Sequence, residues 1–404
     1  MPALIKNRGR NSPGIITFTS SEALWGVPRL SPKVRKFLDF QSQSGRWIFG
    51  VHVQGDLGHL DKWPIHDWLG FVMWPDLNAR FLSNLEPFKR LPLNCVNFMP
   101  SDLASSRSRS RIWDICLISR ASSIKRIDDS LEIIRLLIKK NPSLKVISIV
   151  PDNREFGDPT KVPDNKYFNL PMKIFSSEQL KNLTFVSSST EVFGQYPLGN
   201  EFMKEIILQS KFVMLNSHSE GTPRSLAEAL LLGTPIIVSE NLRSGINNVF
   251  DKTNCIQISD NNSLASEQIL HALSNYGTFN VDRQTSRNLF SESENLPKLK
   301  ELFMRLYPKI DDSSGQWHLD NLHLRLACHG QKKNQQIINS SKLLFNWFDR
   351  VEEISDLDSK IDEDFLNGDN FKDNLSITDL FRRILILGSS KLFRTLRNHS
   401  GLDF

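Results

Sequence analysis

Two acidic side chains stand in one short stretch, Glu220 and Glu228, with seven residues between them. A carboxylate accepts hydrogen bonds from hydroxyl groups strongly and directionally. The N–H groups of Gly221 and Thr222 would attract a diphosphate if a helix begins just beyond them, because the positive end of its dipole would point the same way. The stretch therefore points to a ligand that carries a sugar, a ribose and phosphates.

The elements around these residues read as one βαβ unit. Residues 212–216 are an apolar run of strand length, and residues 217–222 are a short polar loop. A helical apolar pattern begins at Arg224 and stops at Gly233, and residues 235–239 read as a second buried strand. The loop is thus expected beyond the carboxyl end of a strand and against a helix N-terminus, where open parallel sheets bind ligands.

These residues also have ordinary structural interpretations. Ser225 to Glu228 has the spacing of a capping box, in which Glu228 would only reach back to a backbone N–H. Glu220 would be solvated in a surface loop, and Pro223 is a common first-turn residue. The residues alone leave both interpretations open.

A second candidate loop carries two cations, Arg120 and Lys125. It follows an expected strand at 113–118 and leads into an expected helix at 128–140, which has acidic residues at its start and lysines at its end. The chain returns as a strand over 144–150. Arginine and lysine at such a strand end can hold a diphosphate by charge-assisted hydrogen bonds.

The string from Glu220 to Pro235, E-G-x-P-x-x-x-x-E-A-L-x-x-G-x-P, resembles the E-x7-E signature of retaining glycosyltransferases of family four, which have the two-domain GT-B fold. Arg120 and Lys125 fall on the positions of the second signature of this family, an arginine and a lysine separated by four residues. The resemblance covers about 112–275 and is faint before that range.

The resemblance implies an activity and a set of roles. The expected reaction is transfer of a sugar from a nucleotide diphosphate sugar to a glycan, lipid-linked or small-molecule acceptor, with retention and without a metal or cofactor. Glu220 would contact the transferred sugar and Glu228 the ribose, while Arg120 and Lys125 would bind the diphosphate as it leaves. The remaining donor-binding positions would be Gly221, Thr222, Pro223, Ser225 and Leu226.

The sequence departs from the family pattern at several positions. Glycines commonly flank the arginine and lysine of the second signature, but Ser119 and Arg126 stand there. Gly245 of a later turn is retained, whereas Asn248 replaces an acid. The N-terminal part is also about half the usual length and lacks a glycine-rich opening loop.

One histidine of the N-terminal part is a further candidate. His52 lies near the end of an expected strand, and in the family a histidine in such a place commonly approaches the sugar. A lone histidine at a strand end is also compatible with a purely structural role. Trp63, Trp68 and Trp74 could stack on a sugar, although burial in the core is the more usual fate of tryptophan.

The length and composition of the chain limit the number of domains and the class of protein. The 404 residues suggest two or three domains, and 39% hydrophobic residues suffice for proper cores. A formal net charge of +5 gives no argument for nucleic acid. Four cysteines without metal or disulfide spacing read as reduced thiols in a cytoplasmic protein, and neither a signal peptide nor a membrane-spanning segment is expected.

We expect an α/β fold of GT-B type with two Rossmann-like domains. Residues 1–105 would form a reduced acceptor-side domain, 106–290 the nucleotide-sugar domain and 291–404 a mainly helical extension, with a flexible linker at 101–111. In the first domain, strands are expected at 14–19, 47–53, 70–74 and 93–98, and helices around 32–42 and 78–90.

The C-terminal end combines basic and apolar residues over 380–397. Such a segment could lie on an anionic membrane surface and give access to a lipid-linked acceptor, or it could pack against the protein. We therefore expect a cytoplasmic enzyme of polysaccharide biosynthesis with peripheral membrane contact as one possibility. The alternatives are a sugar-nucleotide epimerase and a non-catalytic nucleotide-sugar-binding or scaffold protein.

Overall fold

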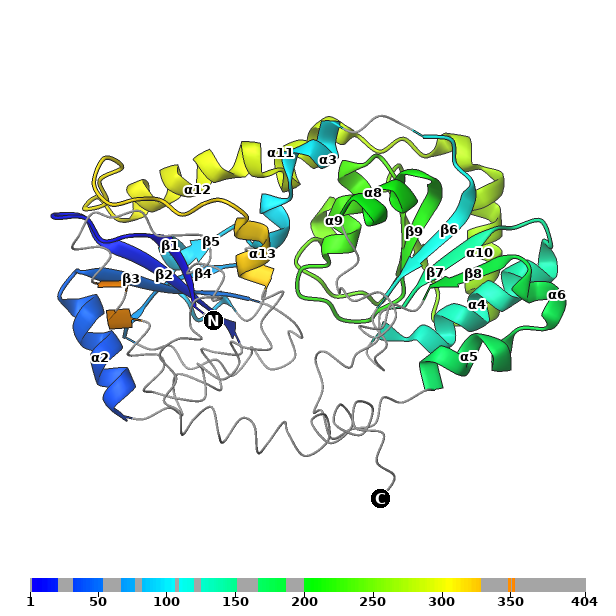
Figure 1. Cartoon of the computed structure of the whole chain (residues 1–404), viewed down its shortest axis with the longest axis horizontal. Helices are drawn as coiled ribbons and strands as arrows, with labels where there is room; N and C mark the ends of the chain where they lie inside the picture. Colours follow the sequence, from blue (N-terminus) through cyan, green and yellow to red (C-terminus); the bar gives the residue numbers. More distant parts are fainter. Residues whose placement is uncertain are drawn as a thin grey trace, which may run out of the picture. The chain divides into compact units, whose positions relative to one another are not determined.

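The computed structural model describes residues 2–20, 32–53, 67–76, 82–105, 109–119, 125–150, 166–186, 200–327, 348–349 and 351–352. Two compact units divide the chain, Met1–Asp358 and Ser359–Phe404, and all described residues belong to the first unit. This unit contains two sheets, each accompanied by helices, so the predicted α/β class is confirmed (Figure 1).

The first sheet has the strand order β1-β2-β3-β4-β5. Its strands are β1 (Ala3–Lys6), β2 (Gly14–Thr19), β3 (Trp47–His52), β4 (Leu69–Met73) and β5 (Arg90–Leu91). β1 runs antiparallel to β2, and the other neighbours are parallel. The order follows the chain, so the described strands of this sheet contain no point where the winding reverses.

The segments between these strands include α2 (Pro32–Gln43), as expected, but two sequence predictions here are wrong. The range expected as a helix, 78–90, contains the short 3-10 helix η4 (Pro87–Lys89) within its described part. The range expected as a strand, 93–98, forms the 3-10 helix η5 (Cys95–Phe98). The Asn94 side chain accepts from the N–H of Cys95 and donates to the carbonyl of Val53, so this cap turns the chain out of the sheet.

The second sheet is fully parallel, with the order β11-β10-β9-β6-β7-β8. Its strands are β6 (Trp113–Ile118), β7 (Val146–Ile149), β8 (Leu183–Val186), β9 (Ser210–Leu215), β10 (Ile236–Ser239) and β11 (Cys255–Ile258). β6 and β9 are neighbours at its centre, and the chain proceeds outward from them in opposite directions. This is the doubly wound arrangement of Rossmann-like domains.

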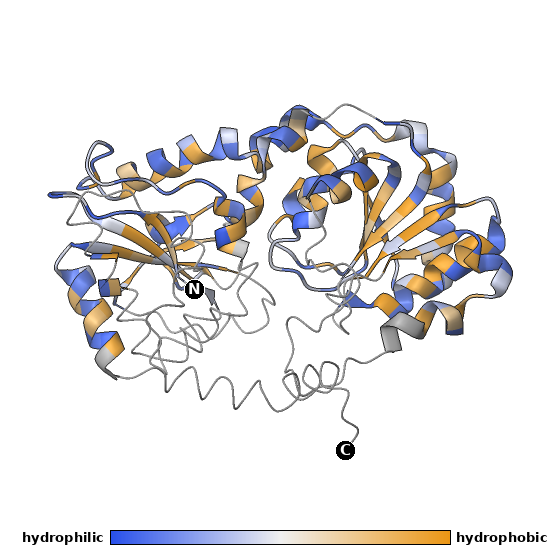
Figure 2. Ribbon diagram, viewed as in Figure 1, coloured by the Kyte–Doolittle hydropathy of each residue, from blue (hydrophilic) through white to orange (hydrophobic). Residues whose placement is uncertain are grey.

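Helices cover both faces of the second sheet, and its strands are therefore apolar on both faces (Figure 2). Ile115 and Leu117 face the core shared with α4 and α10, whereas Cys116 between them faces the opposite core. The helices of this part are α4 (Ile127–Lys140), α5 (Lys166–Ile174), α6 (Ser177–Leu180), α8 (Asn200–Leu208), α9 (Arg224–Leu231), α10 (Asn262–Ser274) and α11 (Arg283–Phe290), with the 3-10 helices η8 (Asn247–Val249) and η9 (Tyr276–Thr278).

The chain beyond residue 291 returns to the first sheet. α12 (Glu292–Leu306) places Phe303 edge-on against Phe71 of β4, with ring centroids 4.9 Å apart, and the hydroxyl of Tyr307 donates to the carbonyl of Gly70 at 2.7 Å. Trp317 bridges to Lys6 of β1, and α13 (Leu322–Ala327) follows with Leu322 and Leu326 in the core. In its described part, the expected helical extension is thus packed onto the N-terminal sheet.

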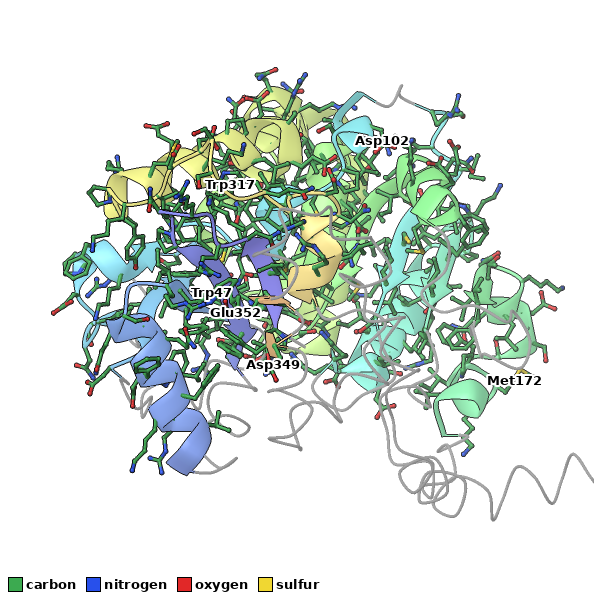
Figure 3. All side chains as sticks on the ribbon, turned by 60° about the vertical axis from the view of Figure 1, so that its left-hand side comes forward. Trp47, Asp102, Met172, Trp317, Asp349 and Glu352 are labelled. Atoms are coloured by element: carbon green, nitrogen blue, oxygen red, sulfur yellow. The ribbon has the colours of Figure 1, made fainter. Side chains whose placement is uncertain are left out.

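Residues 348–352 also lie against this sheet. The Trp47 indole N–H donates to the carboxylate of Glu352, which Arg46 also contacts at 2.7 Å (Figure 3). Phe348 packs edge-on against Trp47 with a centroid distance of 5.3 Å. This short segment therefore covers β3 and the end of α2.

The expected flexible linker, 101–111, is structured at both described ends. Ser101–Ser105 form α3, with Asp102 in its first turn and Leu103 buried. Arg111 donates to the carbonyls of Leu208 and Ser210 at 2.7 and 2.8 Å. Within the described ranges, no helix is long and apolar enough to cross a bilayer. Trp63, the acidic stretch after Glu352 and the basic segment 380–397 lie outside the described residues.

Candidate functional site

The centre of the second sheet sets the place of the site. The winding reverses between β6 and β9, and in doubly wound sheets the loops at the carboxyl ends of these two strands open a crevice that binds ligands. The loop after β6 carries Lys125, and the loop after β9 carries Glu220. Lys125 and Glu220 therefore lie on the two loops that flank one topological switch point.

Lys125 and Glu220 form an ion pair in which the ammonium group donates to the Oε1 atom of the carboxylate. The two side chains are only 13% and 11% exposed. An ion pair so close to buried is screened less by water than a surface pair, and its groups are held in one geometry. The structure thus brings together two residues that the sequence assigned to phosphate and to sugar.

The Glu220 loop is braced by the turn after β10. The backbone carbonyl of Arg243 accepts from the N–H of Glu220, and the N–H of Arg243 donates to the carbonyl of His218, both at 2.9 Å. Gly245 donates to the carbonyl of Gly221 at 2.9 Å. These bonds continue the parallel pairing of β9 and β10 beyond the strands and fix the backbone on either side of Glu220.

The start of α9 leaves two amides free for a ligand. Pro223 is the N-cap and makes no side-chain cap, and no described residue accepts from the N–H of Gly221 or Thr222. The alternative interpretation, a capping box from Ser225 to Glu228, is wrong because Ser225 lies inside the first turn, where its hydroxyl cannot cap the helix. The amides and helix dipole retain their attraction for an anion.

Glu228 contacts a side chain of its own helix. Its Oε1 atom lies 3.4 Å from Arg224, and the two side chains are 19% and 16% exposed. Burial raises the pKa of the Glu228 carboxyl, and the Arg224 charge opposes this shift. A single long contact leaves most of the hydrogen-bonding capacity of the carboxylate unused.

The N-terminal part of the chain approaches this loop and the turn that braces it. The thiol of Cys95 in η5 lies 3.0 Å from the hydroxyl of Thr222. A Cβ atom on Gly245 would come within 3.1 Å of the Trp74 ring, so glycine is needed for this close approach. Burial raises the pKa of the Cys95 thiol, while the Thr222 hydroxyl opposes the shift, so Cys95 serves packing rather than nucleophilic chemistry.

Arg126, the residue after Lys125, has a φ of 49°. This left-handed conformation is free for glycine but strained for other residues. The Arg126 guanidinium contacts Asp260, and its Nε atom donates to Asp129 at 2.8 Å. The side chain thus holds a backbone conformation that glycine would adopt without strain.

Asp260 follows β11 and collects contacts from several loops. Its Oδ1 atom accepts a hydrogen bond from the Arg126 guanidinium and lies 2.7 Å from Nε2 of His218. Its Oδ2 atom accepts from the Asn241 side chain at 2.6 Å. Burial raises the pKa of Asp260, but the hydrogen bonds from His218, Arg126 and Asn241 outweigh it and hold that pKa well below its usual range. Asp260 is therefore ionised at neutral pH.

His52 lies elsewhere. It is fully buried at the end of β3, where Nδ1 lies 3.1 Å from the Thr17 hydroxyl. Burial lowers its pKa to about 3, and the nearby backbone of Leu326 opposes this only weakly. Among the described residues, no hydrogen bond joins His52 to Glu220, and its sugar contact stays a prediction. Trp68 and Trp74 are buried, each 1% exposed.

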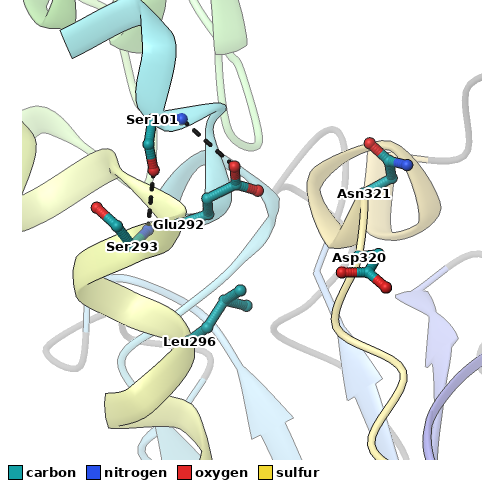
Figure 4. Close-up of a pocket in the computed structure, with 6 residues that line it drawn as sticks. All are labelled: Ser101, Glu292, Ser293, Leu296, Asp320 and Asn321. Carbon is teal, nitrogen blue, oxygen red and sulfur yellow. Dashed lines mark hydrogen bonds between the residues drawn. The ribbon is translucent and has the colours of Figure 1, made fainter. Parts of the chain in front are cut away.

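A pocket of about 440 Å³ lies away from this loop cluster, at the start of α12 (Figure 4). Glu292 accepts from the N–H of Ser101 there at 3.4 Å, and Asp320 and Asn321 lie across from it. Burial raises the pKa of the Glu292 carboxyl. Neither Lys125 nor Glu220 lines this pocket, so we do not assign it as the candidate site.

The described residues include no group of three or more His, Cys, Asp or Glu side chains that could hold a metal ion. Cys95, Cys116 and Cys255 are buried free thiols. Arg120 lies outside the described residues, so its contact with phosphate stays a prediction. Sequence reasoning missed His218 and Asp260 because their pairing depends on loops far apart in the chain.

No protein-family model and no curated protein sequence matches this chain. Solved structures similar to it include a mutant of S. aureus TarM in complex with Fondaparinux, alpha-GlcNAc-glycerol and UDP, with a TM-score of 0.47, 16% identity and coverage of 65% of this chain and 52% of that chain. The pneumococcal O-GlcNAc transferase GtfA in complex with UDP and GlcNAc has a TM-score of 0.45 and 15% identity, with coverage of 67% and 54%. Anabaena HepE in complex with UDP-glucose has a TM-score of 0.45 and 11% identity, with coverage of 68% and 77%.

The present chain spans about half the length of TarM and GtfA. Because these TM-scores are below 0.5, the similarity does not identify a function for this protein. A functional assignment therefore depends on the residues of the site.

Proposed function

We propose that this protein is a glycosyltransferase of GT-B type that transfers a sugar from a nucleotide diphosphate sugar to a hydroxyl-bearing acceptor, with retention and without a metal. The Lys125–Glu220 ion pair at the switch point carries this proposal. It joins a cation suited to phosphate and a carboxylate suited to sugar hydroxyl groups at one place. Cytoplasmic location and a glycan or lipid-linked acceptor belong to the same proposal.

In this reaction, the bond between the sugar and the diphosphate breaks, and negative charge grows on the leaving diphosphate. A bond forms between the same sugar carbon and the acceptor oxygen, and the proton of the acceptor hydroxyl passes to the leaving diphosphate. Lys125 and the free N–H groups of Gly221 and Thr222 stabilise that charge. Fixed donors act well because they need no reorganisation as the charge develops. Arg120 is proposed to contribute a second cation.

The two acids orient the donor. Glu220 accepts from hydroxyl groups of the transferred sugar, which draws its carboxylate partly away from Lys125 and frees the ammonium for phosphate. Glu228 accepts from the ribose hydroxyl groups with the oxygen capacity that Arg224 leaves unused. Neither residue needs to change protonation state, so catalysis rests on position and electrostatics.

Calorimetric titration with UDP, GDP and ADP sugars tests the assignment. We expect one donor to bind the wild type and Glu228→Gln to weaken it by about ten-fold, because a hydrogen bond to a charged group contributes about 1.5–3 kcal/mol. Glu132→Gln is the matched control, since Glu132 also pairs with an arginine of its own helix, Arg135, at 2.6 Å. Equal affinity of the wild type and Glu228→Gln would refute the role of Glu228.

Turnover distinguishes the remaining classes. Release of nucleotide from the bound donor in the presence of an acceptor supports transfer. Conversion of the donor alone into an epimer would identify an epimerase, and binding without turnover over a broad acceptor panel would identify a nucleotide-sugar-binding protein.

A further inference from the structure

We propose that Asp260 is a positioning residue that sets Lys125 and Glu220 relative to one another by holding both of their loops. This inference rests on the proposed function. Asp260 is bound by Arg126, the residue after Lys125, and by His218, two residues before Glu220.

The tie to the first loop passes through Arg126. This residue follows Lys125 directly and precedes α4, whose Ser130 N–H donates to the carbonyl of Arg126 at 3.0 Å. Its φ of 49° is strained for a residue with a side chain, so the contact with Asp260 holds the turn. The direction in which Lys125 leaves the backbone depends on that turn.

The tie to the second loop passes through His218. Its Nε2 atom lies 2.7 Å from Oδ1 of Asp260 and is also contacted by Arg126. The His218 carbonyl accepts from the N–H of Arg243, and the Arg243 carbonyl accepts from the N–H of Glu220. One carboxylate oxygen therefore reaches the loops that carry both members of the ion pair.

Asp260 is itself fixed on its far side. Asn241 donates to its Oδ2 atom at 2.6 Å, and Ser239 donates to Oδ1 at 3.3 Å. Ser239 also accepts from the N–H of Asn241 at 3.1 Å. The loops after β6, β9, β10 and β11 thus converge on one side chain at the carboxyl edge of the sheet.

This arrangement has a chemical use. Ligand binding must loosen the Lys125–Glu220 ion pair, because the carboxylate turns to hydroxyl groups and the ammonium to phosphate. A second link between the two loops keeps their backbones in register while that ion pair opens. Arg126 is neutralised by Asp260 and Asp129, so Lys125 remains the cation of this turn that serves the diphosphate.

Two backbone amides report the two ties by hydrogen exchange, those of Ser130 and Glu220. Asp260→Asn is expected to accelerate exchange at both by about ten-fold, because it removes a charge that receives hydrogen bonds from both loops. Arg126→Gly is expected to accelerate exchange mainly at Ser130, because glycine keeps the backbone conformation but loses the contacts with Asp260 and His218, whereas His218 still binds Asp260.

The matched control is Glu267→Gln. Glu267 of α10 pairs with Lys140 of α4 at 3.1 Å. This ion pair therefore joins α10 to the end of α4, whereas Asp260 and Arg126 meet just before the starts of these two helices. Glu267→Gln should leave the exchange rates of the Ser130 and Glu220 amides, and the turnover, unchanged. Uniform acceleration at all protected amides in Asp260→Asn would show a general loss of stability and would overturn the proposal, as would unchanged exchange at Glu220.

Kinetics with UDP-glucose and UDP-N-acetylglucosamine give the second readout. Asp260→Asn should lower kcat about ten-fold with a donor KM within about two-fold of wild type, because the binding groups remain and only their placement is relaxed. A raised KM with unchanged kcat would contradict a positioning role. If the wild type binds and turns over no nucleotide sugar, the proposed function fails, and the exchange pattern still decides whether Asp260 holds the two loops.

Discussion

Three buried histidines should make this protein lose stability in mild acid. His52, His318 and His323 are 0%, 3% and 2% exposed. Burial lowers the pKa of His318 and of His323 to about 4, and that of His52 to about 3. The nearby charges of Arg325 and Arg224 add to the shifts of His318 and His323, respectively.

The sign follows from proton binding. An unfolded histidine has a pKa near 6.5, so below that pH the unfolded chain binds protons that the folded protein does not. The free energy of unfolding therefore loses nothing to these histidines above about pH 6.5, and it falls as pH decreases toward 4. At pH 5, each histidine lowers the free energy of unfolding by about 2 kcal/mol, from about 1.4 kcal/mol per pH unit over 1.5 units.

Urea unfolding of wild type and His323→Leu at pH 7 and pH 5 tests this reasoning. His323 is the best variant because neither ring nitrogen has a hydrogen-bond partner among the described residues, so its replacement breaks none of the hydrogen bonds described. The drop in unfolding free energy between the two pH values should shrink by about 2 kcal/mol in the variant. His271→Gln on the exposed face of α10 is the control. The same drop in wild type and His323→Leu would refute the argument.

Two further substitutions test the site and the fold. Lys125→Ala should lower kcat by about 100-fold or more, since it removes a fixed donor to the leaving diphosphate, while the melting temperature changes little; an unchanged transfer rate would remove Lys125 from the mechanism. Gly14→Ala should destabilise the protein by about 1–3 kcal/mol in urea unfolding, because its Cβ would meet Trp47 at 2.0 Å; wild-type stability would show that the Trp47 ring moves aside freely.

The second sheet was largely predictable because its signals are local. An apolar run before Ser217, a polar loop and a helix ending at Gly233 gave β9, α9 and β10 almost to the residue. The positive φ of Gly233, 75°, explains why glycine marks that end. The pairing of Lys125 with Glu220 was not predicted, because it depends on the strand order that makes β6 and β9 neighbours.

The first sheet was less predictable because tertiary contacts decide it. Residues 93–98 have a strand-like composition, yet the side chain of Asn94 bonds to Val53 and starts a 3-10 helix. The 291–327 segment gave helical periodicity, but nothing local indicated that Phe303 would meet Phe71. Arg126 in a left-handed turn has no sequence signal, since glycine or asparagine is the residue expected there.

The return of α12 to the first sheet determines when that sheet can be completed during synthesis. The chain leaves at Met99 and comes back at Phe290, where Met99 donates to the carbonyl of Phe290 at 2.8 Å and accepts from Glu292 at 2.9 Å. The residues of the second sheet thus form an insertion within the first. As the ribosome releases the chain from its N-terminus, the second sheet has all its strands before Phe303 and Leu326 emerge to cover β4 and η5. The half that is translated first is therefore the last to be finished.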